Sequence, residues 1–227
     1  MARTIFVGDV HGCRDELADL LDRVAFAGGD RLVMVGDLLV RGPDPRGLLD
    51  LLRASGARSV RGNHEERLLG WRRDPARAVV GDVTLATAKA LRPRDWAFID
   101  ALPLWLDVPE HGIRVVHAGV VPRLPIEQTP PRALMNMRCL DPAGSPLERR
   151  DGPLWGSLWR GPPHVVFGHN AMEGLQLHPW ATGLDTACVY GEALTAMVLN
   201  DGEAPPPPGE RRSRLVSVRA RKRYWPR

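Results

Sequence analysis

Cysteine, lysine and long apolar runs are scarce in this sequence of 227 residues. The few cysteines argue against a disulfide-rich protein, and the short apolar runs argue against a membrane-spanning one. The only cysteines are Cys13, Cys139 and Cys188, which are too far apart for a C-x-x-C pair and suggest no disulfide framework. No apolar run approaches the length of a membrane span, and Asp9 interrupts the first apolar stretch too early for a signal peptide. We therefore expect a cytoplasmic protein without membrane contact.

Lysine is almost missing, because nearly all cations are arginines and only Lys89 and Lys222 are lysines. The formal net charge is +4 at pH 7. The planar guanidinium of arginine matches phosphate oxygens, but genome composition also produces such a bias. We therefore expect no stable nucleic-acid partner. The hydrophobic content of 44% is typical of a globular protein, and the length suits one large domain.

Apolar strands alternate with amphipathic helices in the first third of the chain. The pattern predicts strands at 4–8, 31–35 and 57–60 and helices at 14–25 and 45–55. This order is typical of a largely parallel sheet covered by helices. Further helices are expected at about 65–71, 83–90 and 93–101, and further strands at 104–108, 113–117, 164–167, 175–177, 183–185 and 194–199.

The domain organisation is predicted from composition. Residues 1–204 are expected to form one domain. Within it, the Pro-, Gly- and Arg-rich stretch 122–163 is interpreted as an insertion that caps the site, with a solvated loop as the alternative. Residues 205–227 are expected to contain a polyproline linker, a candidate edge strand at 215–218 and a solvated basic tail.

Polar side chains follow the apolar strands, and each of them is beside a glycine. These side chains are Asp9, His11, Asp37, Arg41, Asn63, His64, His117 and His169. Asp and His are ligands that first-row divalent metals accept, and loops at strand ends are where α/β folds keep their chemistry. One such histidine is more often structural, but five loops of this kind in one chain predict a metal-dependent catalytic site.

The order of these motifs resembles that of the phosphoprotein-phosphatase-type, calcineurin-like metallophosphoesterases. The motifs are Gly-Asp-x-His-Gly, Gly-Asp-x-x-x-Arg-Gly, Gly-Asn-His-Glu, His-Ala-Gly and Gly-His. The resemblance extends from residue 5 to about residue 199. It implies an α/β fold, a four-layer α/β/β/α sandwich in which two mixed β-sheets pack face to face with helices outside.

The resemblance also implies two divalent metal ions, with manganese as the family default and iron, cobalt or zinc compatible with the same ligands. The implied metal ligands are Asp9, His11 and His169 for the first ion, Asn63 and His117 for the second, and Asp37 for both. A hydroxide that bridges the two ions would attack phosphorus in line.

The same resemblance implies roles for three further side chains in binding and converting the substrate. His64 would protonate the leaving oxygen, and Arg41 would bind the phosphoryl group. Arg138 is the candidate second phosphate-binding arginine, because similar Met-Arg segments occur in related enzymes; an ordinary surface arginine is the alternative.

Residue 40 distinguishes two branches of this family. Protein phosphatases carry Gly-Asp-x-Val-Asp-Arg-Gly here, and their second Asp hydrogen-bonds the general-acid histidine; this chain has Val40. The segments 36–43 and 184–191 resemble the bacterial symmetrical bis(5′-nucleosyl)-tetraphosphatases. These enzymes also have a small apolar residue at the position of Val40. The segment 60–65 looks more like the protein phosphatases. A polyphosphate leaving group is a weaker base than a serine alkoxide, so His64 needs less support.

The favoured interpretation is hydrolysis of dinucleoside polyphosphates, with diadenosine tetraphosphate cleaved symmetrically into two ADP. Arginines of 122–163 would hold the distal phosphates, and Trp155 or Trp159 would stack on an adenine. The alternative is a protein serine/threonine phosphatase with a phosphoprotein substrate. A non-catalytic module that binds RNA with its basic tail is disfavoured, because this chain keeps all six metal ligands.

Overall fold

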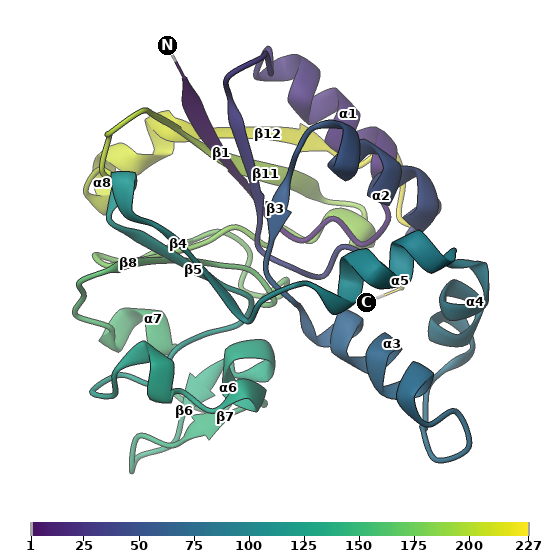
Figure 1. The fold of residues 1–227 in the computed structure, drawn as a ribbon. Coiled ribbons are helices and arrows are strands. Elements are labelled where there is room, and N and C mark those ends of the chain that lie inside the picture. The colour runs from purple at the N-terminus through teal and green to yellow at the C-terminus, as the bar shows by residue number, and fades with distance from the viewer. Residues whose placement is uncertain (1, 227) are drawn as a thin grey trace.

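The computed structural model describes residues 2–226 and contains two five-stranded β-sheets (Figure 1). The first sheet has the order β12-β11-β1-β2-β3. Its parallel strands are β1 (Arg3–Val7), β2 (Arg31–Met34) and β3 (Arg58–Ser59). The strands β11 (Ala193–Asn200) and β12 (Leu215–Arg219) extend it by antiparallel pairing, so the sheet is mixed.

The second sheet has the order β4-β5-β8-β10-β9 and is also mixed. Its strands are β4 (Trp105–Val108), β5 (Ile113–Val116), β8 (His164–Phe167), β9 (Gln176–Leu177) and β10 (Ala181–Gly183). A 3-10 turn, η1 (Pro109–His111), joins β4 to β5 in an antiparallel hairpin. The pairs β5–β8 and β8–β10 are parallel, and β9 pairs antiparallel with β10.

Helices cover the outer face of the first sheet. The connecting helices are α1 (Arg14–Arg23) and α2 (Pro45–Ala54), and α3 (Asn63–Arg73), α4 (Asp82–Ala90) and α5 (Pro93–Asp100) follow β3. Helix α2 begins with Pro45 after Asp44, whose carboxylate accepts the backbone N–H of Gly47. Among residues 2–226, none of the helices combines the length and apolar character that crossing a membrane requires.

The apolar core has three clusters, and two of them lie on opposite faces of the first sheet, whose strands are buried on both faces. Along β1, the side chains of Ile5 and Val7 pack in the core beneath the helices, while Phe6 packs in the core between the two sheets. Successive side chains of a strand point to opposite faces, so such a strand has a continuous apolar sequence. The prediction of two mixed sheets with helices outside is confirmed by this arrangement.

The stretch 122–163 contains short elements and forms a third core against the second sheet. These elements are η2 (Ile126–Gln128), α6 (Pro131–Asn136), β6 (Cys139–Leu140), β7 (Pro146–Leu147) and α7 (Trp155–Leu158). Leu134 and Trp155 of this stretch pack with Phe167 of β8. In Figure 1, α6, α7, β6 and β7 lie together on the side of the second sheet away from the first.

The C-terminal segment was expected to be a solvated tail, and this expectation is wrong. After α8 (Pro208–Arg211), η4 (Arg212–Arg214) and β12, the chain folds back onto α1. Arg221 forms ion pairs with Asp15 and Asp19, and the Tyr224 hydroxyl donates to Glu16 over 2.7 Å. The acidic face of α1 provides partners for the basic tail, which the tail's own composition does not reveal.

Candidate metal centre

The strand-end side chains predicted from the sequence meet at one place, where the two sheets adjoin. Asp9 and His11 follow β1, Asp37 follows β2, and Asn63 and His64 begin α3. His117 and His169 come from the second sheet, directly after β5 and β8. A cavity of about 470 Å³ is lined by all the predicted site residues except His117, which lies beside Asp37.

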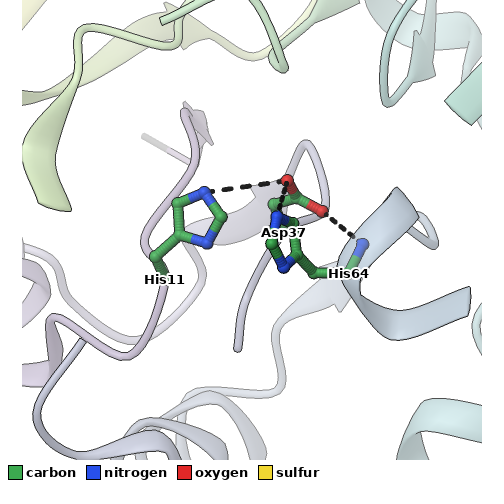
Figure 2. Close-up of side chains that lie close together, drawn as sticks. All are labelled: His11, Asp37 and His64. Carbon is green, nitrogen blue, oxygen red and sulfur yellow. Dashed lines mark hydrogen bonds and ion pairs between the residues drawn. The ribbon is translucent and has the colours of Figure 1, made fainter. Parts of the chain in front are cut away.

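Asp37 is the centre of this group, and three histidines surround its carboxylate. Figure 2 shows His11 from the loop after β1 and His64 from the first turn of α3 next to the carboxylate of Asp37. The Nε2 atoms of His11 and His64 lie 3.7 Å and 3.9 Å from Asp37 Oδ2, and His117 Nε2 lies 3.4 Å from Oδ1. The backbone N–H of His64 donates to Oδ1 over 3.0 Å, which fixes the carboxylate.

The position of His169 corrects the expected division of the ligands. Its ring lies with His117, at 5.1 Å between centroids, and ligand atoms of Asp37, His117 and His169 lie within 4.8 Å of one another. His117 Nε2 is also 3.1 Å from Asn63 Oδ1. His169 reaches Asp9 only through its backbone N–H, at 3.0 Å from Oδ2. The structure therefore groups His169 with Asn63 and His117, not with Asp9 and His11.

The imidazoles of His11 and His117 are oriented as metal ligands through Nε2. His11 Nδ1 lies 3.1 Å from the Leu39 carbonyl oxygen, and His117 Nδ1 lies 2.9 Å from that of Val35. An Nδ1–H bonded to a carbonyl leaves the Nε2 lone pair free for a metal. Burial lowers the pKa of His11 to about 4 and holds the pKa of His169 well below its usual value. A lowered pKa favours the neutral form of His11 and His169, which is the form in which imidazole binds a metal.

Three carboxylates are buried in the site, and bound cations would compensate their negative charge. Burial, with the nearby Asp185 and Asp37, raises the pKa of Asp9 well above its usual value, and burial raises the pKa of Asp185 to about 6. Asp9 Oδ1 is buried and has no hydrogen-bond partner among residues 2–226. Burying a carboxylate oxygen without a partner is costly, and a bound cation removes that cost. This donor set therefore fits divalent metal ions.

Glu65 ties the loop after β2 to the start of α3. Its Oε1 accepts the backbone N–H groups of Leu38 and Leu39, and its Oε2 accepts that of Gly62. Burial, followed by the charge of Asp37, raises the pKa of Glu65 to about 7. A Cβ atom at Gly62 would overlap the Asp37 carboxylate, so this position requires glycine.

Backbone strain is concentrated in the same loops. His11, Asp37, Val40, Arg41 and His169 all have positive φ angles, between 46° and 74°. Non-glycine residues rarely adopt this region, and it is least favourable for a β-branched side chain such as valine. Strain of this kind is typical of functional sites, where the surrounding structure holds it.

Arginines line the open part of the cavity. Arg41 donates to the Tyr190 hydroxyl over 2.8 Å, and Tyr190 belongs to the turn η3 (Cys188–Tyr190). Arg138 donates to the Glu148 carbonyl over 3.0 Å, and its Nε is buried without a partner among residues 2–226. Two exposed arginines also line the cavity, Arg67 and Arg150. The cavity therefore combines a carboxylate-rich base with guanidinium groups, which match phosphate oxygens.

His64 has no carboxylate partner at its second nitrogen. Its Nδ1 is buried and makes no hydrogen bond within residues 2–226, and burial keeps the pKa of His64 well below its usual value. The ring of His11 packs edge-on against it at 4.9 Å. This agrees with the presence of Val40, whose side chain cannot accept a hydrogen bond.

The proposed stacking of Trp155 or Trp159 on a base is wrong. Both are buried, and their indole N–H groups donate to the carbonyl oxygens of Ala118 and Pro163. Neither lines the cavity. They hold the stretch 122–163 against the second sheet.

Several cavity residues were not predicted as site residues, among them Asp185, Tyr190, Arg67 and Trp225. The resemblance of 184–191 to the tetraphosphatases was a usable signal for Asp185 and Tyr190. No signal in the sequence pointed to Trp225, because it lies in a basic terminal segment with no motif.

Comparison with known proteins agrees with this geometry. The model of the calcineurin-like phosphoesterase family matches residues 2–199. A symmetrical bis(5′-nucleosyl)-tetraphosphatase of Janthinobacterium sp. is 32% identical, with 87% of this chain and 93% of the relative covered. The crystal structure of a proposed diadenosine tetraphosphatase has a TM-score of 0.84 and 37% identity, with 96% of this chain and 93% of that chain covered.

Another relative differs in its cleavage pattern. The asymmetrical bis(5′-nucleosyl)-tetraphosphatase PrpE of Geobacillus thermodenitrificans is 28% identical, with 84% of this chain and 88% of the relative covered. Similarity therefore extends to proteins named for both symmetrical and asymmetrical cleavage.

Proposed function

The chain belongs to the calcineurin-like phosphoesterase family, and we propose that it hydrolyses dinucleoside polyphosphates, cleaving diadenosine tetraphosphate into two ADP. The observation that carries the proposal is that Asp37 belongs to two groups of candidate metal-ligand side chains, one with His11 and His64 and one with His117 and His169, and lines a cavity that arginines also line. A tetraphosphate chain presents several anionic groups, so it suits a site with more than one phosphate-binding arginine.

Two divalent metal ions are part of this proposal, with manganese as the first candidate. Asp9 and His11 would hold one ion, the group of Asn63, His117 and His169 would hold the other, and Asp37 would contact both. When bound, the ions lower the pKa of water and neutralise charge on the phosphoryl oxygens.

The remaining chemistry belongs to side chains of the chain itself. Arg41, held by the Tyr190 hydroxyl, and Arg138 bind phosphoryl oxygens. His64 lines the same cavity, with Nε2 3.9 Å from Asp37 Oδ2, and moves a proton to the leaving oxygen. The lowered pKa of His64 reduces the fraction of the ring that is protonated, which suits a leaving group that needs little proton donation. The stretch 122–163 acts as a cap, through Asn136, Arg138, Glu148 and Arg150 at the cavity.

The proposal predicts the products of a single assay. Manganese-loaded protein is incubated with diadenosine tetraphosphate and with a phosphoserine peptide, and the products are separated by chromatography, with a chelator-treated sample as the control. We expect ADP as the only nucleotide product, and none after chelation. AMP with ATP would assign asymmetrical cleavage. Phosphate from the peptide with an intact dinucleotide would establish the protein phosphatase alternative.

Replacing Val40 with Asp is expected to favour phosphomonoesters. The new carboxylate would supply the missing partner of His64 Nδ1, and general acid catalysis contributes roughly 10²–10⁴-fold, so we expect a gain of about tenfold for poor leaving groups. Asp also tolerates the positive φ of residue 40 better than Val does. The measurement is the ratio of kcat/KM for a phosphomonoester to kcat/KM for diadenosine tetraphosphate.

The control is Val40→Asn, which has a similar shape and tolerance for positive φ but no charge. If this ratio stays constant in Val40→Asp, or if Val40→Asn raises it equally, the leaving-group argument fails.

A further inference from the structure

The C-terminal segment 221–226 is attached to α1 by an array of hydrogen bonds. The guanidinium of Arg221 reaches Asp15 at 2.8 Å and Asp19 at 2.9 Å, and its backbone N–H donates to Glu16 over 3.0 Å. The Tyr224 hydroxyl donates to the same Glu16 oxygen, and the Glu16 side chain is fully buried. These bonds fix both ends of the four-residue stretch 221–224, so this stretch has a defined place on α1.

The same segment is attached to the turn η3. The backbone N–H groups of Tyr224 and Trp225 both lie 3.0 Å from the Val189 carbonyl oxygen, and Arg223 Nε lies 3.3 Å from that of Tyr190. The neighbouring Tyr190 side chain holds Arg41 in the cavity. The tail is therefore anchored to an element that itself positions a phosphate-binding arginine.

This anchoring places Trp225 at the metal-site cavity. Trp225 and Pro226 line the cavity together with Met172, which is 55% exposed. Trp225 is half-buried: part of it packs on the core beneath the helices, and part remains exposed. The cavity has an exposed apolar rim and a charged floor with phosphate-binding arginines. Such an arrangement recognises a phosphate attached to a flat, apolar group.

We propose that Trp225 binds the nucleobase of the substrate by stacking, and that residues 221–224 position it for this role. The inference rests on the proposed function and extends it, because it names the group that distinguishes a dinucleotide from other phosphate esters. Every base has a π-face, so a tryptophan platform binds nucleotides with little dependence on the base. A cavity of about 470 Å³ is of the size that holds a small ligand, and the arginines hold the attached phosphates.

The test compares substitutions of Trp225 that separate stacking from packing. Trp225→Ala removes both, Trp225→Leu keeps apolar packing on the core without a π-face, and Trp225→Phe keeps an aromatic ring. We expect Ala and Leu to raise KM for diadenosine tetraphosphate by about tenfold, and Phe to restore most of the affinity. The increase in KM is expected to be much smaller for glycerol 2-phosphate, which has no aromatic ring to stack on Trp225.

Two further variants control for indirect effects. Trp180→Ala removes another exposed tryptophan, outside this cavity, and is expected to leave both KM values unchanged. Arg221→Gln breaks the ion pairs that hold the tail and is expected to raise KM for diadenosine tetraphosphate in the same direction by a smaller factor. Melting temperatures establish that each variant is folded.

Binding of ADP separates failure of this inference from failure of the proposed function. Calorimetric titration of the manganese-loaded protein with ADP needs no turnover, so it decides the inference even if diadenosine tetraphosphate is not hydrolysed. Weaker ADP binding in Trp225→Ala and Trp225→Leu, with recovery in Trp225→Phe, supports the stacking role. Recovery by Leu, equal losses on both substrates, or unchanged ADP binding overturns it.

Discussion

Replacing Asp37 with Asn is expected to lower kcat/KM for diadenosine tetraphosphate by about a thousandfold. Among residues 2–226, Asp37 is the one carboxylate that belongs to both candidate ligand groups, so its loss would remove the contact shared by the two proposed cations. Metal-ion stabilisation of a phosphoryl transition state is worth several kcal/mol, and each 1.36 kcal/mol or so is a factor of ten in rate. The neutral amide keeps the size of the side chain and can still accept the His64 backbone N–H.

The measurement combines steady-state kinetics with metal analysis. The bound manganese is counted after gel filtration, and the melting temperature is recorded with and without manganese. We expect the wild-type protein to gain stability from manganese and Asp37→Asn to gain much less, because ligands that bind only the folded state stabilise it. Asp107→Asn, which changes an exposed carboxylate paired with Arg114, is the matched control. A variant that retains two ions and a tenth of the activity would contradict the assignment of Asp37.

Replacing His64 with Asn is expected to slow turnover while the metal content stays at the wild-type value. His64 Nε2 is 3.9 Å from Asp37 Oδ2, and its ring is not needed for either of the proposed ligand sets. A general acid contributes roughly 10²–10⁴-fold, and the contribution depends on how strong a base the leaving group is. We therefore expect a loss of about a hundredfold for alkyl phosphates and about tenfold for diadenosine tetraphosphate.

A series of phosphate esters with leaving groups of different pKa tests this expectation. The dependence of log kcat on leaving-group pKa is expected to become steeper in His64→Asn, because proton donation no longer compensates for a poor leaving group. His178→Asn is the control, since His178 lies outside the cavity. A uniform loss across the series would remove the proton-transfer role of His64, and a loss of manganese would make His64 a metal ligand instead.

The elements that position the metal centre were predictable because their signals are local. The apolar runs and helical periodicities predicted β1, α1, β2 and α2 to within a few residues, and the polar side chains follow strand ends as expected. Burial on both faces makes a strand continuously apolar, and glycine permits the close approach of carboxylates in the turns that follow. The fold class followed from the resemblance of the ordered motifs to those of a known family.

Contacts between distant segments were decided only by the tertiary structure. His169 lies with His117 because β8 and β5 are parallel neighbours, and both strands end at the same edge of the second sheet. The sequence could not distinguish a buried tryptophan such as Trp155 from the cavity tryptophan Trp225. The residue type is the same, and only the tertiary contacts of each side chain differ.

The sequence by itself therefore determined which side chains are available for metal and phosphate binding, because periodicity and turn chemistry are properties of short segments. The tertiary structure decided which of them share a ligand group and which aromatic ring borders the cavity. It also decided that the basic tail binds the acidic face of α1 instead of extending into solvent. Pairings of this kind depend on charges and surfaces more than 200 residues apart in the chain, as for Arg221 and Asp15, and no local pattern records them.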